Sequence, residues 1–145
     1  MTNTVSITFK LKTSDIHAGL GFEAWVDDKK FIDIDHVRHP HLLKIDMPDV
    51  DGDHELRLVL KGKTEAHTRI DEQGNVVSDA TLTINDIAFD EINLGHTLTQ
   101  LATYTHDFNG TKEPTQEKFY SKIGCNGVVS LKFATPIYLW LLENM

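Results

Sequence analysis

One turn of the sequence gathers three aspartates, Asp49, Asp51 and Asp53, in a D-x-D-G-D run that also contains Gly52. Calcium takes roughly six to eight oxygen ligands, and closely spaced carboxylates on a turn supply several of them. The run is not an EF-hand, because the twelfth residue counted from Asp49 is Leu60 rather than glutamate. Two interpretations follow: a calcium site, or a solvated loop on an acidic protein.

Histidine is frequent in this chain, with eight residues in 145. His36, His39 and His41 form an H-x-x-H-P-H run, and His39 and His41 fall on one face under a period of two. Together with Asp33 or Asp35 they are the ligand types that zinc and iron use. No second cluster with ligand spacing follows, so a polar, histidine-rich loop is the alternative interpretation.

Aromatic side chains offer a different chemistry, because their flat apolar faces stack on sugar rings and fill protein interfaces. Trp25 has the opposite phase to Phe22, Ala24 and Val26, so it is exposed if its strand has one wet face. An inner strand covered on both faces is the alternative. The candidate ligand-binding aromatics are Trp25, Tyr104, Phe119 and Tyr120.

No constellation for covalent catalysis is present. Cys125 is the only thiol, in a glycine-rich turn, and His106 lies about twenty residues earlier without a third group to orient it. The sequence has no G-x-S-x-G and no glycine motif that cradles phosphate. We therefore expect a binding or assembly protein rather than an enzyme.

The charge, the cysteine content and the lengths of the apolar runs limit the classes of partner that this protein can have. The formal net charge is −8 and the basic residues are scattered, which argues against nucleic acid as a partner. A single cysteine excludes an intrachain disulfide and suits a reducing compartment. The start of the sequence lacks the pattern of a signal peptide. No apolar run approaches the roughly 20 residues that span a bilayer, so we expect no membrane partner.

The segments around these residues follow a period of two, which is typical of strands with one buried face. Polar residues 27–30 separate two such stretches and predict a hairpin. Asn85 and Asp86 either separate two strands or bend one. The predicted strands cover residues 5–11, 21–35, 42–45, 54–60, 80–84, 87–94, 103–108 and 128–134.

Between the strands, residues 61–79 and 111–118 are polar and predict loops, and residues 95–102 have room for one helical turn. Many short strands with frequent turn signals and no long amphipathic helix predict an all-β fold, an antiparallel β-sandwich of jelly-roll type. The length fits one domain, so we expect a single β-sandwich domain over residues 1–145.

The last ten residues, 136–145, differ from the rest because apolar side chains cover most faces of the segment. Thr135 is the predicted N-cap of a short helix, with Pro136 in its first turn. The segment either packs on the sandwich or forms an apolar tail that docks on another copy or another protein. The candidate interface residues are Ile137, Tyr138, Leu139, Trp140 and Leu142.

Over residues 21–94 the order of elements resembles the calcium-dependent, xylan-binding carbohydrate-binding modules attached to bacterial glycanases. The similar segments are a strand leading into WVDDKKF, then DGDHELRLVLKGK, then LTINDIAFDEINL. The resemblance implies a small jelly-roll module. Gly62 and Lys63 stand where an Asn-Asp pair is expected to help hold calcium, so no calcium ligand is carried over.

The segments YTHDFNGTKEPTQEKFY, GCNG and TPIYLWLLENM are similar to small uncharacterised proteins encoded by tailed phages of marine cyanobacteria. That resemblance implies a virion-associated or host-takeover protein, in the virion or the host cytoplasm, and supplies no site residues.

Three hypotheses result. The first is a non-catalytic glycan-binding module, in one setting a virion accessory. The second is a structural protein that forms homo-oligomers, or binds another virion protein, through residues 136–145. The third is a metal-dependent enzyme that uses residues 36–41.

Overall fold

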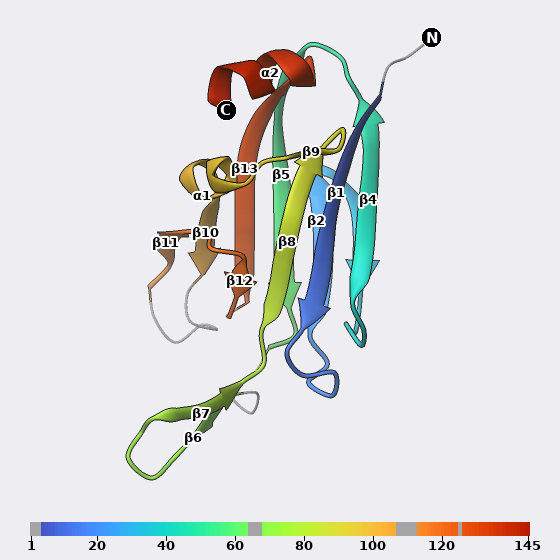
Figure 1. Ribbon diagram of the computed structural model, residues 1–145. Coiled ribbons are helices and arrows are strands. Elements are labelled where there is room, and N and C mark those ends of the chain that lie inside the picture. The colour runs from blue at the N-terminus through green and yellow to red at the C-terminus, as the bar shows by residue number, and fades with distance from the viewer. Residues whose placement is uncertain (1–3, 64–67, 107–112, 125) are drawn as a thin grey trace.

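A computed structural model describes residues 4–63, 68–106, 113–124 and 126–145. Two antiparallel sheets pack face to face as a β-sandwich (Figure 1), which confirms the predicted fold class. The first sheet has the strand order β12-β8-β1-β4, and β9 pairs with β8. Its strands are β1 (Thr4–Thr13), β4 (His41–Pro48), β8 (Leu82–Phe89), β9 (Ile92–Asn93) and β12 (Lys122–Ile123).

The second sheet has the strand order β11-β10-β13-β5-β2-β3. Its central strands β5 and β13 pair over nine residues, and all its pairings are antiparallel. Its strands are β2 (Gly21–Val26), β3 (Lys29–Ile34), β5 (Gly52–Lys61), β10 (Thr103–His106), β11 (Thr115–Lys118) and β13 (Gly127–Thr135).

The core lies between the two sheets and follows directly from the period of two. Successive side chains of a strand point to opposite faces, so one phase of each strand is buried and the other is not. In β1 the buried phase is Ile7, Phe9 and Leu11, and in β5 it is Leu56, Leu58 and Leu60. Phe9 and Phe22 meet edge to face with ring centroids 5.9 Å apart, which ties the sheets together.

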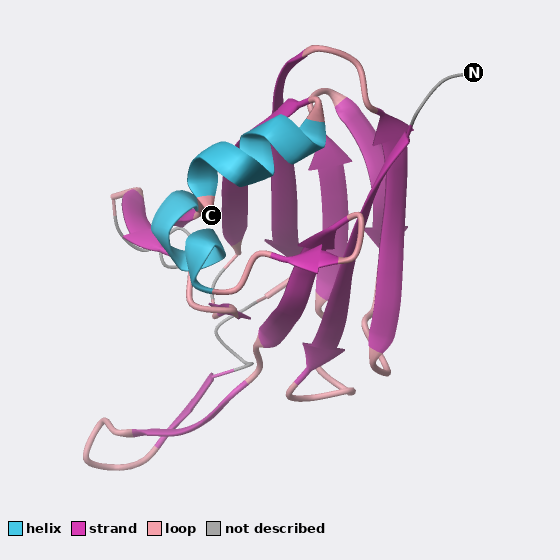
Figure 2. Ribbon diagram, turned by 45° about the horizontal axis from the view of Figure 1, so that its top comes forward, coloured by secondary structure: helices cyan, strands magenta, loops and turns pink. Residues whose placement is uncertain are grey.

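Helix α2 (Ile137–Asn144) follows β13 and covers one end of the sandwich (Figure 2). Ile137, Trp140 and Leu141 are buried, and the Trp140 ring lies 5.7 Å from that of Phe89 and 6.3 Å from that of Phe133. The opposite side of the helix is exposed. One face of residues 136–145 therefore packs on the core and the other is exposed. The prediction that Ile137 and Trp140 belong to an exposed interface was wrong, because both side chains fill the core.

The predicted N-cap of α2 was wrong. Pro136 occupies the N-cap position, and the amide of Ile137 donates a hydrogen bond to Asp49 Oδ1 at 3.0 Å. The Thr135 hydroxyl instead donates to the carbonyl of Val50. A carboxylate from a distant loop thus satisfies the helix N-terminus, a contact that the local sequence does not encode.

Two predicted loops contain strands. Residues 61–79 include β6 (Thr68–Ile70) and β7 (Val76–Asp79), which pair only with each other and project away from the sandwich in Figure 1. Residues 111–118 include β11, whose side chains are all polar, so no buried apolar face indicates a strand in the sequence.

Asn85 and Asp86 bend a single strand: β8 changes register with β1 at this point, and Asp86 has a φ of 57°. The helical turn predicted at residues 95–102 is α1 (His96–Leu101).

Within the described ranges, neither helix has the length and apolarity that crossing a membrane requires.

The packing predicts the effect of emptying the core. Replacing Phe89 by alanine is expected to lower the free energy of unfolding by about 3–5 kcal/mol, because the ring is fully buried against Phe133 and Trp140. Urea denaturation measures the change. Leu42→Ala is the matched control, since Leu42 is 75% exposed and its loss should cost less than about 0.5 kcal/mol. Equal losses for both variants would contradict this packing.

Candidate functional site

The outer face of the second sheet carries the polar phase of its strands. Strand register places Thr103 opposite Ser130, Ser130 opposite Arg57, and Arg57 opposite Trp25. Facing residues of neighbouring strands point to the same side of a sheet, so these side chains form one row across β10, β13, β5 and β2. Lys132 and Glu55 face each other in the next row.

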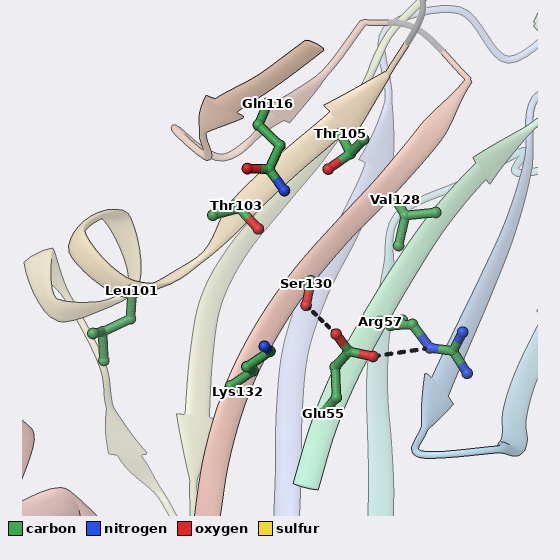
Figure 3. Close-up of a pocket in the computed structure, with 9 residues that line it drawn as sticks. All are labelled: Glu55, Arg57, Leu101, Thr103, Thr105, Gln116, Val128, Ser130 and Lys132. Atoms are coloured by element: carbon green, nitrogen blue, oxygen red, sulfur yellow. Dashed lines mark hydrogen bonds and ion pairs between the residues drawn. The ribbon is translucent and has the colours of Figure 1, made fainter. Parts of the chain in front are cut away.

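A trough of about 460 Å³ lies over these rows between α1 and β5 (Figure 3). Hydroxyl, amide and charged side chains dominate its lining, and only two apolar residues contribute. The lining residues are Glu55, Arg57, Leu101, Thr103, Thr105, Gln116, Val128, Ser130 and Lys132. The trough therefore combines polar groups with the apolar parts of these side chains, which suits a ligand that forms hydrogen bonds and also has apolar faces.

Some polar groups of the trough are already paired. Ser130 Oγ donates to Glu55 Oε2 at 2.6 Å, and Arg57 Nε lies 3.6 Å from Glu55 Oε1. Arg57 also donates to the main-chain carbonyl of Asp27. Arg57 Nε is buried and lacks a hydrogen-bond partner in the described structure, and within it Lys132 forms no ion pair. Lys132 is thus an exposed donor of the trough that a ligand can reach.

Trp25 borders this surface. Its side chain is half-buried on the outer face of β2, and its indole N–H donates to Glu23 Oε1 at 2.9 Å. The Arg57 guanidinium and the Lys30 ammonium each lie 5.6 Å from the centre of the indole ring. These cations hold the ring in place, and any ligand that stacks on the ring must share or displace them.

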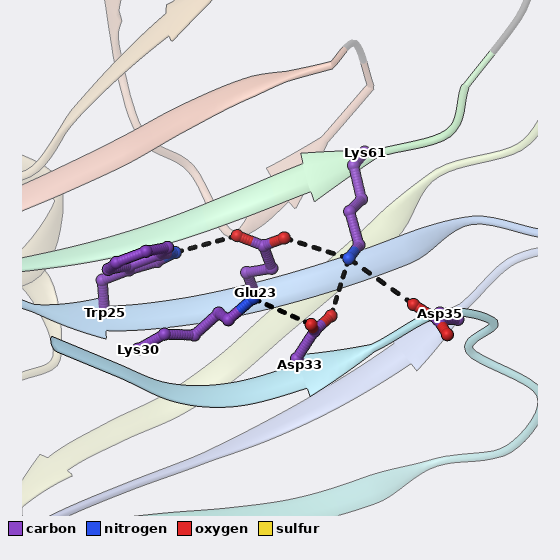
Figure 4. A network of polar contacts seen from close by, with 6 residues as sticks. All are labelled: Glu23, Trp25, Lys30, Asp33, Asp35 and Lys61. Carbon is purple, nitrogen blue, oxygen red and sulfur yellow. Dashed lines mark hydrogen bonds and ion pairs between the residues drawn. The ribbon is translucent and has the colours of Figure 1, made fainter.

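Beside Trp25, Lys61 is the centre of an acidic network (Figure 4). Its ammonium nitrogen lies 2.6 Å from Asp33 Oδ1, 3.0 Å from Glu23 Oε2 and 3.7 Å from Asp35 Oδ1. The hydrogen bonds from Lys61 and then Trp25 lower the pKa of Glu23, and those from Lys61 and then Lys30 lower the pKa of Asp33. The hydrogen bond to Asp33, followed by that to Glu23, raises the pKa of Lys61. The network fixes β2, β3 and β5 beside the indole.

The structure separates the four candidate ligand-binding aromatics. Tyr104 is only 6% exposed and its ring lies 4.6 Å from that of His106, whereas Tyr120 is 70% exposed. Both line a shallow hollow of about 270 Å³ beside β10 and β12, away from Trp25. Phe119 is fully buried. Trp25 alone borders the trough, so the structure does not unite these residues into one aromatic platform.

The predicted metal ligands are not gathered either. Asp49 accepts the amide hydrogen of Ile137, while Asp51 and Asp53 are exposed. Across the described residues, no three histidine, cysteine or acidic side chains are close enough together to hold a metal ion. The calcium ligands Asp49, Asp51 and Asp53 therefore remain a prediction.

The histidine run has local partners. The rings of His39 and His41 lie 4.2 Å apart, as their shared phase predicts, and His36 Nε2 lies 2.8 Å from the carbonyl oxygen of Ile16. Burial, followed by the charge of His39, lowers the pKa of His41.

Cys125 lies outside the described residues. His106 Nε2 lies 3.1 Å from Glu117 Oε2, on the neighbouring strand β11.

Sequence reasoning missed most of the trough. The apolar side chains of β5 and β13 alternate with Arg57, Ser130 and Lys132. The alternation therefore predicts that these three polar side chains face away from the core. The sequence does not predict that these side chains come together, because the strand order β10-β13-β5-β2 joins segments that lie far apart in the chain.

The Lys61 network predicts the acid sensitivity of the protein. Glu23 and Asp33 have lowered pKa values in the folded state, so their stabilisation is present above their ordinary pKa and disappears as the pH falls through the folded-state value. Lys61→Met should therefore reduce the loss of stability between about pH 7 and about pH 3, measured by urea unfolding. Lys10→Met, which breaks one exposed pair with Asp86, is the control. An unchanged loss in Lys61→Met would rule out this role.

Comparisons with known proteins show the fold. No protein-family model matches this chain, and no curated protein sequence matches it. The solved structure "vCBM60 in complex with galactobiose", a carbohydrate-binding module, is similar with a TM-score of 0.53 and 10% sequence identity. The match covers 87% of this chain and 96% of that chain. Because the sequence identity is this low, the match shows a shared β-sandwich fold and nothing further.

Proposed function

We propose that this protein is a non-catalytic glycan-binding module and that the trough on the second sheet is its binding surface. The observation that carries the proposal is the polar trough itself, placed on the exposed face of a sandwich whose fold a carbohydrate-binding module shares. The structural neighbour was solved with galactobiose, which supports a glycan as the ligand class.

The chemistry of the trough matches a sugar better than an apolar ligand. Sugars present many hydroxyl groups, and each needs a donor or acceptor when it leaves water. Thr103, Thr105 and Gln116 supply neutral partners, and Lys132 supplies a charged donor. The volume of about 460 Å³ falls in the usual range of small-ligand sites.

Trp25 provides an aromatic surface at one side of the trough. Arg57 links the two, because it lines the trough and also lies against the indole ring. A sugar bound over Ser130 and Arg57 would have the indole as its neighbour in the same row of side chains.

The predicted calcium site at Asp49, Asp51 and Asp53 is a separate proposal, since none of these residues lines the trough.

A glycan array probed with the full chain, with and without calcium, tests the proposal. We expect binding to at least one glycan, and Gln116→Ala with Lys132→Ala should weaken it about tenfold or more, because each change removes a hydrogen-bond donor. Lys44→Ala, on the first sheet, is the matched control. Absence of binding by folded protein under both conditions would refute the function. Binding that is insensitive to the trough variants would refute the site.

The exposed side of α2 supports a second candidate, an assembly protein that forms homo-oligomers. Tyr138, Leu139 and Leu142 are 54%, 58% and 80% exposed, and Met145 is 56% exposed beyond them. Apolar side chains grouped in this way are typical of protein interfaces. A neighbouring virion protein is the alternative partner for the same surface, and virion association rests on the resemblance to phage proteins.

Light scattering tests whether the exposed side of α2 binds a second copy of the chain. If α2 mediates self-association, the full chain should be oligomeric at micromolar concentration, and Leu139→Ser with Leu142→Ser should make it monomeric without unfolding it, because both side chains are exposed. Leu42→Ser, on β4, is a control of similar exposure. A monomeric wild-type chain would eliminate this candidate.

A further inference from the structure

Another cavity lies at the end of the sandwich where the β2–β3 hairpin meets the loop between β4 and β5. It measures about 660 Å³ and is separate from the trough. The end of edge strand β4 and the turn before edge strand β3 form its two sides, so it opens between the sheets. Its lining residues are Val26, Asp27, Asp28, Lys29, Phe31, Asp46, Met47, Pro48, Val50, Asp51 and His54.

The floor of this cleft is apolar. Val26 and Met47 are buried at 4% exposure each, Phe31 is half-buried, and Val50 is 59% exposed at the mouth. The floor therefore favours an apolar group that leaves water.

The rim of the cleft is acidic. Four carboxylates surround the floor, and Lys29 is the only lysine or arginine in the lining. Burial opposes ionisation of Asp27, but the hydrogen bonds from His54 and from the Glu55 amide outweigh it and lower the Asp27 pKa. Asp28 is fully exposed and lies 4.0 Å from Arg57, and Asp51 is exposed. The hydrogen bonds from His54 and Glu55 thus favour the charged form of Asp27.

One contact inside the cleft shows which chemistry it accommodates. The ammonium group of Lys29 lies 4.8 Å from the centre of the Phe31 ring. A cation over an aromatic face is favourable, so the Phe31 ring suits the charged group of a basic ligand.

From this cleft we infer a docking site for a basic, apolar peptide segment of a partner protein, with an apolar side chain on the floor and a neighbouring arginine or lysine at the carboxylate rim. Charge complementarity selects this occupant, because the four rim carboxylates would repel an acidic segment and would give a neutral one no ionic attraction. The overall charge of −8 steers the same class of partner toward the protein. The inference is independent of the glycan trough.

A peptide titration of the isotope-labelled full chain tests the site. The probe is acetyl-Leu-Arg-Leu-Arg-amide, and its analogue with citrulline in place of arginine keeps the shape but removes the charge. Amide shifts should be confined to residues 26–31 and 46–54. The arginine peptide should bind more tightly than the citrulline peptide, and added salt should weaken it.

Three variants sharpen the result. Asp28→Asn and Asp51→Asn should each weaken binding about twofold to fivefold, as expected for exposed ion pairs. Lys29→Met should strengthen binding about twofold, because it removes the internal competitor. An unfolded variant cannot produce such a gain. Glu72→Gln and Glu113→Gln, exposed carboxylates outside the cleft, are the charge-matched controls.

Equal binding of the two peptides, shifts outside the cleft, or equal weakening by Glu72→Gln and Asp51→Asn would each overturn the inference. Shifts in the trough alone would mean that the peptide binds at the proposed glycan surface instead. None of these results depends on the glycan array, so the two proposals fail separately.

Discussion

The pairing of β5 with β13 on one side and β2 on the other determines most of this structure. It sends Leu56, Leu58 and Leu60 into the core and Glu55 and Arg57 to the outer face. Because side chains alternate along a strand, a slip of one residue would exchange these two sets. The core and the trough are thus specified by the same register, and the burial of the leucines stabilises the placement of the polar rows.

The sequence predicted the sandwich well because its long strands alternate cleanly and their buried phase faces one core. It predicted β11, β12 and the β6–β7 pair poorly, since these strands are short or polar and derive their structure from partners. The trough combines strands whose order in the sheet differs from their order in the chain, as with Ser130 between Thr103 and Arg57. Local patterns hold no information on that order.

Asp27 connects the two surfaces of the molecule. It has a φ of 54° in the tight turn between β2 and β3, its carboxylate accepts hydrogen bonds from His54 and the Glu55 amide, and its carbonyl accepts one from Arg57. Arg57 lines the trough, whereas Asp27 and His54 line the acidic cleft. One turn therefore positions a cation for the first surface and carboxylates for the second.

One edge strand of each sheet, β4 in the first and β3 in the second, carries charged side chains. Lys29, Lys30 and Asp33 lie on β3, and Lys44 and Asp46 lie on β4, which ends at Pro48. Bare strand edges promote aggregation by adding strands from other molecules, and charges or proline at an edge oppose that addition. The charges of β3 and β4 consequently oppose main-chain pairing with another molecule at these two edges, and leave side-chain surfaces as the route by which association would occur.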